Sequence, residues 1–358
     1  MISAEEWGAR AASASLAVNT NFGHRLFGLP GTWIARISTA PTQRTEWHYW
    51  WQAHYLDCLV DAGWREYLAQ EPEAFRLSMK RIKALPRTIR LRNFLRFSNS
   101  FFDDMAWLAL AAGRADALRR KAEGKPLPQA RAVRRSLEPQ LRKAFSEELG
   151  GGMFWSKQRD YKNAPVNGPG ALYFARTGDQ QRAQRVLDWM REYLWDPQRQ
   201  LYIDGVHLRA AGAEREETIW SYNQGPVLGA LCALPTPANL ELAAEIIDGV
   251  ERGLLENGAL VLHGDGDPGL FTGILARYLS IAARTGALPD ASRASARRMV
   301  IDTAEALWAA RSTREPLVFT NKLGISADQA FPAAEAVGLS SQLQAWMIFE
   351  VAHQLALA

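Results

Sequence analysis

The chain of 358 residues contains only two cysteines, Cys58 and Cys232, which lie far apart in the sequence. No disulfide framework and no zinc-ligand spacing can be built from them, so we expect two buried free thiols. The six histidines include neither a His-x-x-x-His nor a His-Glu-x-x-His spacing. The sequence therefore predicts no metal site, and we expect no cofactor.

Long hydrophobic runs are also missing. No window approaches the ~18 consecutive apolar residues of a membrane span, so we expect no integral membrane segment. The first seven residues place Glu5 and Glu6 where a signal peptide has a basic start and an apolar stretch. We therefore expect a cytoplasmic protein, or a secreted one if a signal peptide has been removed.

Charge of one sign is not in excess either, because 42 basic residues face 38 acidic ones. This balance gives no indication of nucleic acid as a partner. A Gly-rich phosphate loop and a Gly-x-Ser-x-Gly nucleophile motif are both absent from the sequence. Among common catalytic groups, these absences leave carboxylates.

Tryptophan, in contrast, is abundant, with 13 in the chain. Several stand beside polar aromatic or amide residues, as in Trp47–Gln52 and Trp220–Gln224. Aromatic faces with hydrogen-bonding tips suit amphipathic ligands. Sugars are such ligands, so an oligo- or polysaccharide is the expected partner.

Two adjacent carboxylates, Asp103 and Asp104, lie within an apolar and aromatic segment, Phe101–Trp107. Most such pairs are helix starts or solvated turns. If these two are buried together, charge repulsion and desolvation raise at least one of their pKa values. A pair of carboxyl groups with separated pKa values can act as an acid and a base.

The pattern of apolar residues is helical nearly throughout, which predicts an all-α protein with one domain over residues 1–358. Short connections favour antiparallel neighbouring helices, but periodicity alone does not separate a barrel of helical hairpins from a two-lobed bundle. Glycines at 63 and 113 mark expected helix ends, and residues 200–204 and 259–262 are possible short strands. Helices are expected at about 46–62, 101–112, 131–149, 166–177, 179–194, 217–234, 238–256, 269–285, 291–310 and 326–355, the last with a break.

Several polar motifs stand where loops meet helix starts. Gly151–Ser156, followed by Lys162, Asn163 and Asn167, could line a cleft or only form turns. Asp204 lies in an Asp-Gly pair typical of a hairpin turn, with sugar binding as the alternative. Tyr222 and Asn223 begin a helix with amides that could bind a ligand. The Gly264–Gly269 segment superficially suggests a calcium loop, but a plain turn is favoured.

Taken in order, these motifs resemble glycoside hydrolase family 76, the endo-α-1,6-mannanases. The similarity runs from about residue 45 to residue 285. It is carried by Tyr49–Gln52, Phe101–Trp107, Gly151–Ser156, Lys162–Ala164, Asn167–Pro169, Tyr222–Gly225 and Phe271–Ile274.

The resemblance implies an (α/α)6 barrel and a retaining hydrolase of α-1,6-linked mannose chains. It implies that Asp103 is the nucleophile and Asp104 the acid/base. Neighbouring side chains can adopt the ~5–5.5 Å separation that a retaining mechanism requires. The candidate substrate-binding residues are Trp50, Trp51, Trp155, Asn163, Asn167, Asp204, Tyr222, Asn223 and Phe271.

Two alternatives remain at this point. One is an all-α enzyme of prenyl diphosphate chemistry, which usually has a further acid four residues after the first Asp of the pair. Position 107 is Trp instead. The other is a glycan-binding protein whose cleft has lost its activity.

Overall fold

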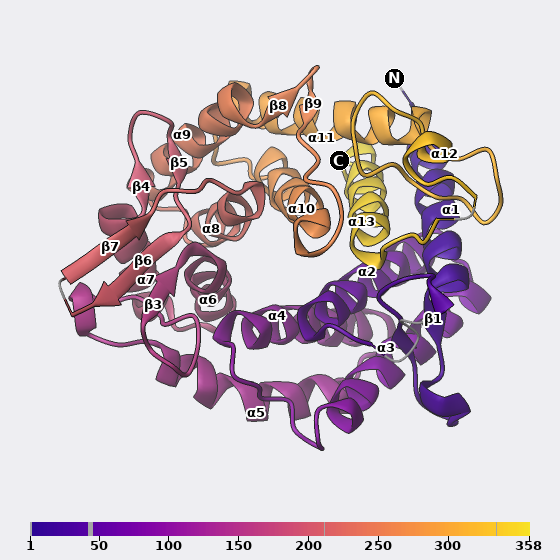
Figure 1. Ribbon diagram of the computed structural model, residues 1–358, viewed down its shortest axis with the longest axis horizontal. Coiled ribbons are helices and arrows are strands. Elements are labelled where there is room, and N and C mark those ends of the chain that lie inside the picture. Colours follow the sequence, from indigo (N-terminus) through magenta and orange to yellow (C-terminus); the bar gives the residue numbers. More distant parts are fainter. Residues whose placement is uncertain (1, 42–45, 211, 334) are drawn as a thin grey trace.

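Twelve long helices alternate between an inner and an outer layer in the part of the chain that the computed structural model describes, residues 2–41, 46–210, 212–333 and 335–358 (Figure 1). The inner helices are α2 (Tyr49–Leu68), α4 (Phe102–Glu123), α6 (Ala164–Thr177), α8 (Ser221–Ala233), α10 (Phe271–Ala283) and α13 (Leu339–Ala356). The outer helices are α1 (Ala4–Asn21), α3 (Pro72–Arg92), α5 (Pro128–Ala144), α7 (Gln180–Tyr193), α9 (Pro237–Gly253) and α11 (Asp290–Ala309).

The inner helices form a closed ring. Each packs against the inner helix before it and the one after it, and α13 packs back onto α2. Helix α1 lies against α13, so the two ends of the chain meet on one side of the ring (Figure 1). The all-α (α/α)6 barrel is therefore confirmed, and the two-lobed bundle is excluded by the closure.

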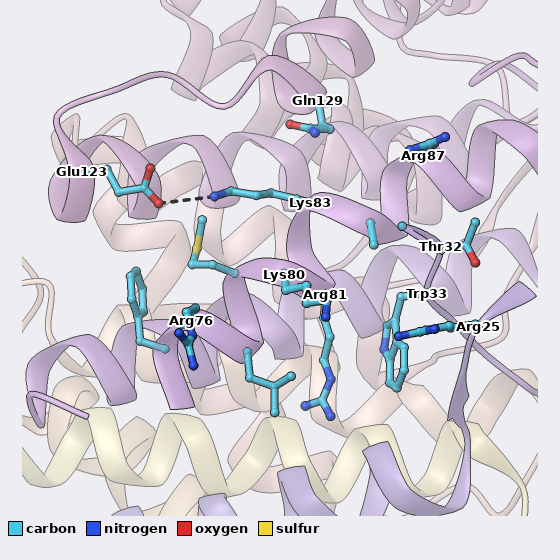
Figure 2. Close-up of a pocket in the computed structure, with 15 residues that line it drawn as sticks. Arg25, Thr32, Trp33, Arg76, Lys80, Arg81, Lys83, Arg87, Glu123 and Gln129 are labelled. Carbon is cyan, nitrogen blue, oxygen red and sulfur yellow. Dashed lines mark hydrogen bonds and ion pairs between the residues drawn. The ribbon is translucent and has the colours of Figure 1, made fainter. Parts of the chain in front are cut away.

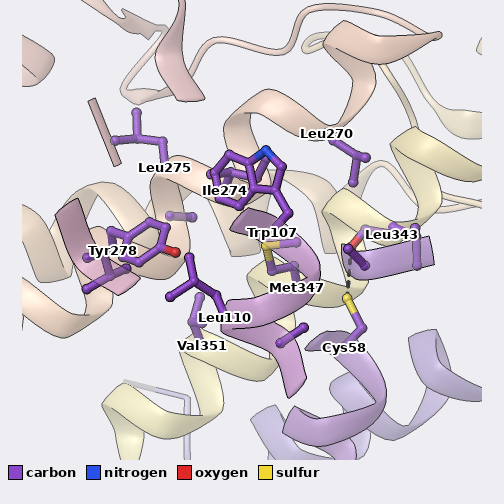
Figure 3. Packing of buried hydrophobic residues seen from close by; sticks show 14 of the residues in the cluster. Cys58, Trp107, Leu110, Leu270, Ile274, Leu275, Tyr278, Leu343, Met347 and Val351 are labelled. Carbon is purple, nitrogen blue, oxygen red and sulfur yellow. Dashed lines mark hydrogen bonds between the residues drawn. The ribbon is translucent and has the colours of Figure 1, made fainter. Parts of the chain in front are cut away.

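Burial explains which helices lie inside. Helix α10 has buried residues at 12 of its 13 positions, as expected for a helix surrounded by other helices. The outer helix α5 buries only one stripe, Ala130, Val133, Leu137, Leu141 and Ala144, spaced three or four residues apart. Figure 3 shows apolar side chains from α2, α4, α10 and α13 filling the space between the inner helices. The barrel interior is thus a packed core.

Short strands and 3₁₀ turns occupy the connections. β1 (Gly23–His24) pairs with β2 (Ile34–Ala35), β4 (Trp195–Asp196) with β5 (Leu201–Tyr202), and β8 (Leu255–Glu256) with β9 (Ala259–Leu260). A three-stranded antiparallel sheet has the order β3 (Tyr161–Asn163), β6 (Gly205–Arg209) and β7 (Gly212–Glu216). The remaining elements are η1 (Leu26–Gly28), η3 (Glu148–Gly150), η4 (Asp267–Leu270) and the short α12 (Ala327–Ala330).

The two expected glycine ends are wrong. Helix α2 continues through Gly63, where a Cβ would lie 2.7 Å from a methyl carbon of Leu118. Gly63 therefore allows α2 and α4 to approach closely. Helix α4 likewise continues through Gly113 and ends at Gly124, whose φ of +67° is the left-handed conformation of a helix C-cap.

Other boundaries also differ from the prediction. Helix α5 ends at Ala144, five residues earlier than expected, where the chain turns into the η3 loop. The expected helix over 326–355 is divided into α12 and α13. Helices α1 and α3 were not predicted. The assignment of residues 1–358 to one catalytic domain stays a prediction.

No helix within the described residues is both long and apolar enough to cross a membrane. The cysteines are free, with Cys58 buried and Cys232 half-buried. The Cys58 thiol lies 3.8 Å from the carbonyl oxygen of Leu343 in the barrel interior (Figure 3).

Candidate active site

A cleft of about 460 Å³ opens where the inner helices begin. The first turns of α2, α4, α8 and α10 and the segment before α6 all contribute side chains to it. Its lining is formed almost entirely by aromatic and acidic residues: His48, Tyr49, Trp50, Phe101, Asp103, Asp104, Trp107, Trp155, Tyr161, Asn163, Asp204, Tyr222, Asp267 and Phe271.

Asp103 and Asp104 occupy the first turn of α4. A ladder of backbone contacts fixes this helix start, because the Phe102 amide donates to the carbonyl of Trp155 at 2.7 Å. The Trp155 amide in turn donates to the carbonyl of Tyr161, at the start of β3, at 2.8 Å. β3 pairs with β6, which begins directly after Asp204. The ladder thus places carboxylates from distant parts of the sequence in one cleft.

Burial dominates the electrostatics of the pair. Desolvation raises the pKa of Asp103 to about 7, against the opposing effect of a hydrogen bond with Trp155. Desolvation and then the charge of Asp103 raise the pKa of Asp104 well above its ordinary value. The N-terminal end of a helix favours carboxylate anions, but burial outweighs that effect here. Burial therefore favours the protonated form of both groups, and the charge of Asp103 favours it further at Asp104.

Asn99 contacts Asp104 directly. Its amide nitrogen donates to Asp104 Oδ2 at 2.5 Å, and its side-chain oxygen accepts from the Phe101 amide at 3.0 Å. Two other buried oxygens of the cleft, Asp103 Oδ1 and Asn163 Oδ1, have no hydrogen-bond partner among the described residues. Buried polar atoms normally have a partner, and hydroxyl groups of a bound sugar could provide one.

Two further carboxylates face the pair. Asp204 accepts hydrogen bonds from the Tyr161 hydroxyl at 2.6 Å and the Asn223 amide at 3.0 Å. Asp267, in η4, accepts from the indole nitrogens of Trp50 at 3.0 Å and Trp51 at 2.8 Å. The negative charge of Asp204 contributes to the raised pKa of Asp103, and that of Asp267 to the raised pKa of Asp104.

Aromatic rings form two walls of the cleft. Tyr222 stacks on Phe271 with ring centres 3.9 Å apart and planes 10° apart. On another side, the ring of Phe101 lies 4.8 Å from that of Trp155. Flat apolar surfaces beside polar groups suit an amphipathic ligand.

The comparisons with known proteins agree with this geometry. The sequence profile of Glycosyl hydrolase family 76 matches residues 17–352, which is nearly the whole chain. The chain belongs to this family. No protein of curated function matches the chain at a significant level.

Solved structures extend the comparison. An α-1,6-mannanase from Salegentibacter sp. HEL1_6 is 27% identical, with a TM-score of 0.83 over 98% of this chain and 99% of the other. A second structure of that mannanase is an inactive variant with two consecutive aspartates changed to asparagine, bound to α-1,6-mannotriose. It is 26% identical, with the same TM-score and coverage. A family 76 mannosidase from Bacteroides thetaiotaomicron VPI-5482, 17% identical, shares the fold with a TM-score of 0.76 over 98% of both chains.

Membership of family 76 makes this chain a glycoside hydrolase. The prenyl diphosphate alternative is thereby set aside. Within the described residues, no group of three or more histidine, cysteine or acidic side chains is arranged to hold a metal ion.

Six of the nine predicted substrate-binding residues line the family 76 cleft with the aspartate pair. These are Trp50, Trp155, Asn163, Asp204, Tyr222 and Phe271. Asp204 does not lie in a hairpin turn as its sequence suggests. It connects β5 to β6, which belong to different sheets.

The other three predicted residues lie behind the lining. Asn167 is fully buried and binds the backbone of Met153 in both directions, accepting at 2.7 Å and donating at 3.0 Å. Asn223 donates to Asp204, and Trp51 donates to Asp267, so each orients a carboxylate of the cleft. Lys162 also points away from the cleft, because its ammonium group binds carbonyls of the loop around η3.

Six lining residues were not predicted. Tyr49, Phe101 and Trp107 were quoted within motifs without a site role, and Tyr161 was noted only as part of a loop. His48 and Asp267 belong to segments interpreted as a helix and a plain turn. The repeated association of aromatic residues with acids was the available signal for Asp267, which stands four residues before Phe271.

Proposed function

We propose that this protein hydrolyses α-1,6-linked mannose chains with retention of anomeric configuration. The observation that carries the proposal is the pair Asp103–Asp104 at the base of an aromatic cleft. It is supported by the 27% identical mannanase, whose inactive variant carries changes at two consecutive aspartates and binds α-1,6-mannotriose.

In the first step, the Asp103 carboxylate attacks the anomeric carbon while the bond to the leaving oxygen breaks. Asp104 gives its proton to that oxygen, so the leaving chain departs as a neutral alcohol and a glycosyl ester remains on Asp103. In the second step, Asp104 takes a proton from water as the water oxygen attacks the same carbon. The ester bond breaks, Asp103 returns to the carboxylate, and two inversions give net retention.

The electrostatics favour this division of roles. A nucleophile must be ionised and a general acid must be protonated at the same pH. Of the two groups, Asp104 is next to Asp103 and Asp267, and its pKa is raised well above its ordinary value by burial and by these charges. Asp103 is hydrogen-bonded by Trp155, which favours its ionised form.

Substrate contacts follow from the lining. The stacked pair Tyr222–Phe271 and the rings of Trp50 and Trp155 offer apolar surfaces for the C–H faces of mannose. Asp204 and the unpaired Asn163 oxygen can accept hydrogen bonds from sugar hydroxyls.

The direct test measures hydrolysis of α-1,6-mannotetraose by purified variants. Asp103→Asn and Asp104→Asn are each expected to lower kcat by about 1,000-fold or more with the fold intact by circular dichroism. Asp290→Asn, at a side chain that is 94% exposed, is the matched control and should leave kcat unchanged. Near-normal turnover in either cleft variant would contradict the proposal. Mannotetraose binding by the unaltered enzyme without hydrolysis would favour a glycan-binding protein instead.

The assignment of roles needs a separate experiment. With dinitrophenyl α-1,6-mannobioside and added azide, Asp104→Ala should yield the α-glycosyl azide, because azide attacks the ester on Asp103. Asp103→Ala should yield the β-glycosyl azide by direct attack. Exchange of the two products between the variants would reverse the roles, and product anomers are read by ¹H NMR.

The cytoplasmic location stays a prediction.

A further inference from the structure

A second cavity in the described part of the chain lies outside the active site. It measures about 740 Å³ and runs between α3 and the segment before β2 (Figure 2). Its floor is apolar, with Trp33, Phe75 and Met79, and Glu123 is its one acidic residue. Six cationic side chains line it: Arg25, Arg76, Lys80, Arg81, Lys83 and Arg87.

The cations on α3 follow a helical stripe, which we call the basic face. Arg76, Lys80, Lys83, Arg87 and Arg90 are spaced by four, three, four and three residues. This spacing places them on one side of the helix over about 21 Å. Arg76 pairs with Glu73 and Lys83 with Glu123, whereas Lys80, Arg87 and Arg90 have no ion-pair partner within the described ranges. The stripe therefore carries excess positive charge.

Exposed apolar side chains stand at the end of this stripe. Phe94 is 89% exposed and Leu95 is 62% exposed, directly after α3. Phe27, in η1, is 73% exposed. Large apolar side chains on a surface mark an interaction site when they gather in one place.

The backbone at these three positions is also unusual. Phe94, Leu95 and Phe27 have φ of +50°, +61° and +48°. A bulky residue in the left-handed region is strained, and Asn or Gly is the usual occupant. Because these side chains are exposed, packing within the protein does not explain the choice of Phe and Leu.

The two segments belong to one surface. Phe27 and Arg92 line the same small cavity together with Trp47. The Trp33 amide donates to Thr88 of α3 at 2.9 Å, and Arg87 lies beside Gly31. Figure 2 shows Arg25 and Arg87 at the same end of the larger cavity as Thr32 and Trp33.

We propose that the basic face, with Phe27, Phe94 and Leu95, docks onto an anionic lipid bilayer. Lysine and arginine beside a membrane are attracted to phosphate-containing headgroups, and neighbouring apolar side chains enter the interfacial region. A soluble polyanion would engage the cations but gives no reason for the strained, exposed apolar residues. The cations and the apolar residues together therefore favour a lipid surface.

Docking would place the active site beside the bilayer. Trp47 of the small cavity precedes His48 of the cleft, and the Tyr49 hydroxyl donates to the carbonyl of Phe97, three residues after Phe94. The enzyme could then reach glycan chains anchored at the same surface. This inference goes beyond the proposed function and does not depend on it.

The test is flotation of the full-length protein with vesicles of phosphatidylcholine alone or with about 30% phosphatidylglycerol. We expect binding to the anionic vesicles only, with release in about 0.5 M NaCl. Lys80→Glu with Arg87→Glu should lower the partition coefficient by about tenfold or more. The matched control, Arg131→Glu with Arg135→Glu on exposed positions of α5, changes the net charge equally and should have less than about a twofold effect.

A second variant separates docking from folding. Phe94→Asn relieves the positive φ, so its thermal midpoint should stay level or rise while vesicle binding falls several-fold. Absence of binding to anionic vesicles, an equal loss in the α5 control, or binding to soluble polyphosphate but not to vesicles would each overturn the proposal.

Discussion

Two clusters of carboxylates in the barrel have opposite surroundings. In the cleft, Asp103, Asp104, Asp204 and Asp267 face one another among aromatic rings, and no cationic side chain lines that cavity within the described residues. Deeper in the barrel, Asp57 and Asp61 on α2 contact two arginines. Arg114 binds both carboxylates, and Arg277 lies 3.4 Å from Asp57 and 2.7 Å from Asp61.

The pKa directions follow these surroundings. Burial alone raises the pKa of Asp57, but the charges of Arg114 and Arg277 outweigh it and lower the pKa to about 2. Burial without such cations raises the pKa values of Asp103 and Asp104. We therefore expect aspartate to be structural where arginine neutralises it and reactive where no cation does, a contrast that further experiments can probe.

The largest expected change in stability comes from removing one cation of the deep cluster. Arg277→Met leaves Asp57 and Asp61 with a single arginine partner in a buried site, so we expect a loss of about 3–5 kcal/mol in the free energy of unfolding. The control is Arg298→Met on α11, whose pair with Glu251 is half-exposed and should contribute about 0–1 kcal/mol. Urea unfolding measures both, and equal losses would contradict the contrast.

Acid should weaken the deep cluster selectively. A carboxyl group with a lowered folded-state pKa stabilises the fold above its unfolded-state pKa, and this contribution disappears as pH falls through the folded-state value. For Asp57 the window runs from about pH 4 to pH 2. The advantage of the unaltered protein over Asp57→Asn should shrink by about 2 kcal/mol between pH 5 and pH 2. A constant difference across this range would show that Arg114 and Arg277 do not act through the Asp57 charge.

The cleft should behave in the opposite way. Because the folded-state pKa of Asp104 is raised, its contribution to stability is present at low pH and is lost as pH rises through that value. Asp104→Asn resembles the protonated acid and can still accept the bond from Asn99, so it should stabilise the fold by about 1–2 kcal/mol at pH 8. The gain should vanish near pH 4, as followed by thermal unfolding. A loss of stability at pH 8 would argue against strain in the charged pair.

The contrast also explains which residues of the two clusters could be identified from the sequence. Asp103 and Asp104 were identifiable because two charges adjoin apolar residues within one helix turn. Arg277 was not, because a cation in a helix normally lies on the surface, and only the closed barrel brings it to α2. Asp267 lies 163 residues from Asp104, and its charge raises the pKa of Asp104 from η4, a proximity that local pattern does not encode.

Two asparagine side chains show the same limit of prediction from the sequence. Asn163 and Asn167 both stand at the start of α6, yet only Asn163 lines the cleft, since Asn167 is engaged with the backbone of Met153. About one helical turn separates the residue that lines the cleft from the one that is structural. The helical fold itself was predictable because burial leaves its periodic trace in the helices. Helix α3 carries this trace too, with Met79, Ile82, Leu85 and Ile89 buried at helical spacing, but it was missed.

The smallest expected effects are shifts in the pH dependence of kcat/KM. Asn99→Ser removes a hydrogen bond to Asp104 that lowers its pKa, while the shorter hydroxyl can still accept from the Phe101 amide. Loss of that bond raises the pKa of Asp104, so the alkaline limb, where the acid loses its proton, should move to higher pH by about half a unit.

Asp267→Asn should shift the same limb the other way. It removes a negative charge that raises the pKa of Asp104, so the limb should move to lower pH by about half a unit. Asp265→Asn, two residues away and exposed, is the control and should leave the profile in place. Shifts of the same sign in Asn99→Ser and Asp267→Asn would mean that Asp104 does not set the alkaline limb. Opposite shifts would show that the alkaline limb follows the pKa of Asp104, which the hydrogen bond from Asn99 lowers and the charge of Asp267 raises.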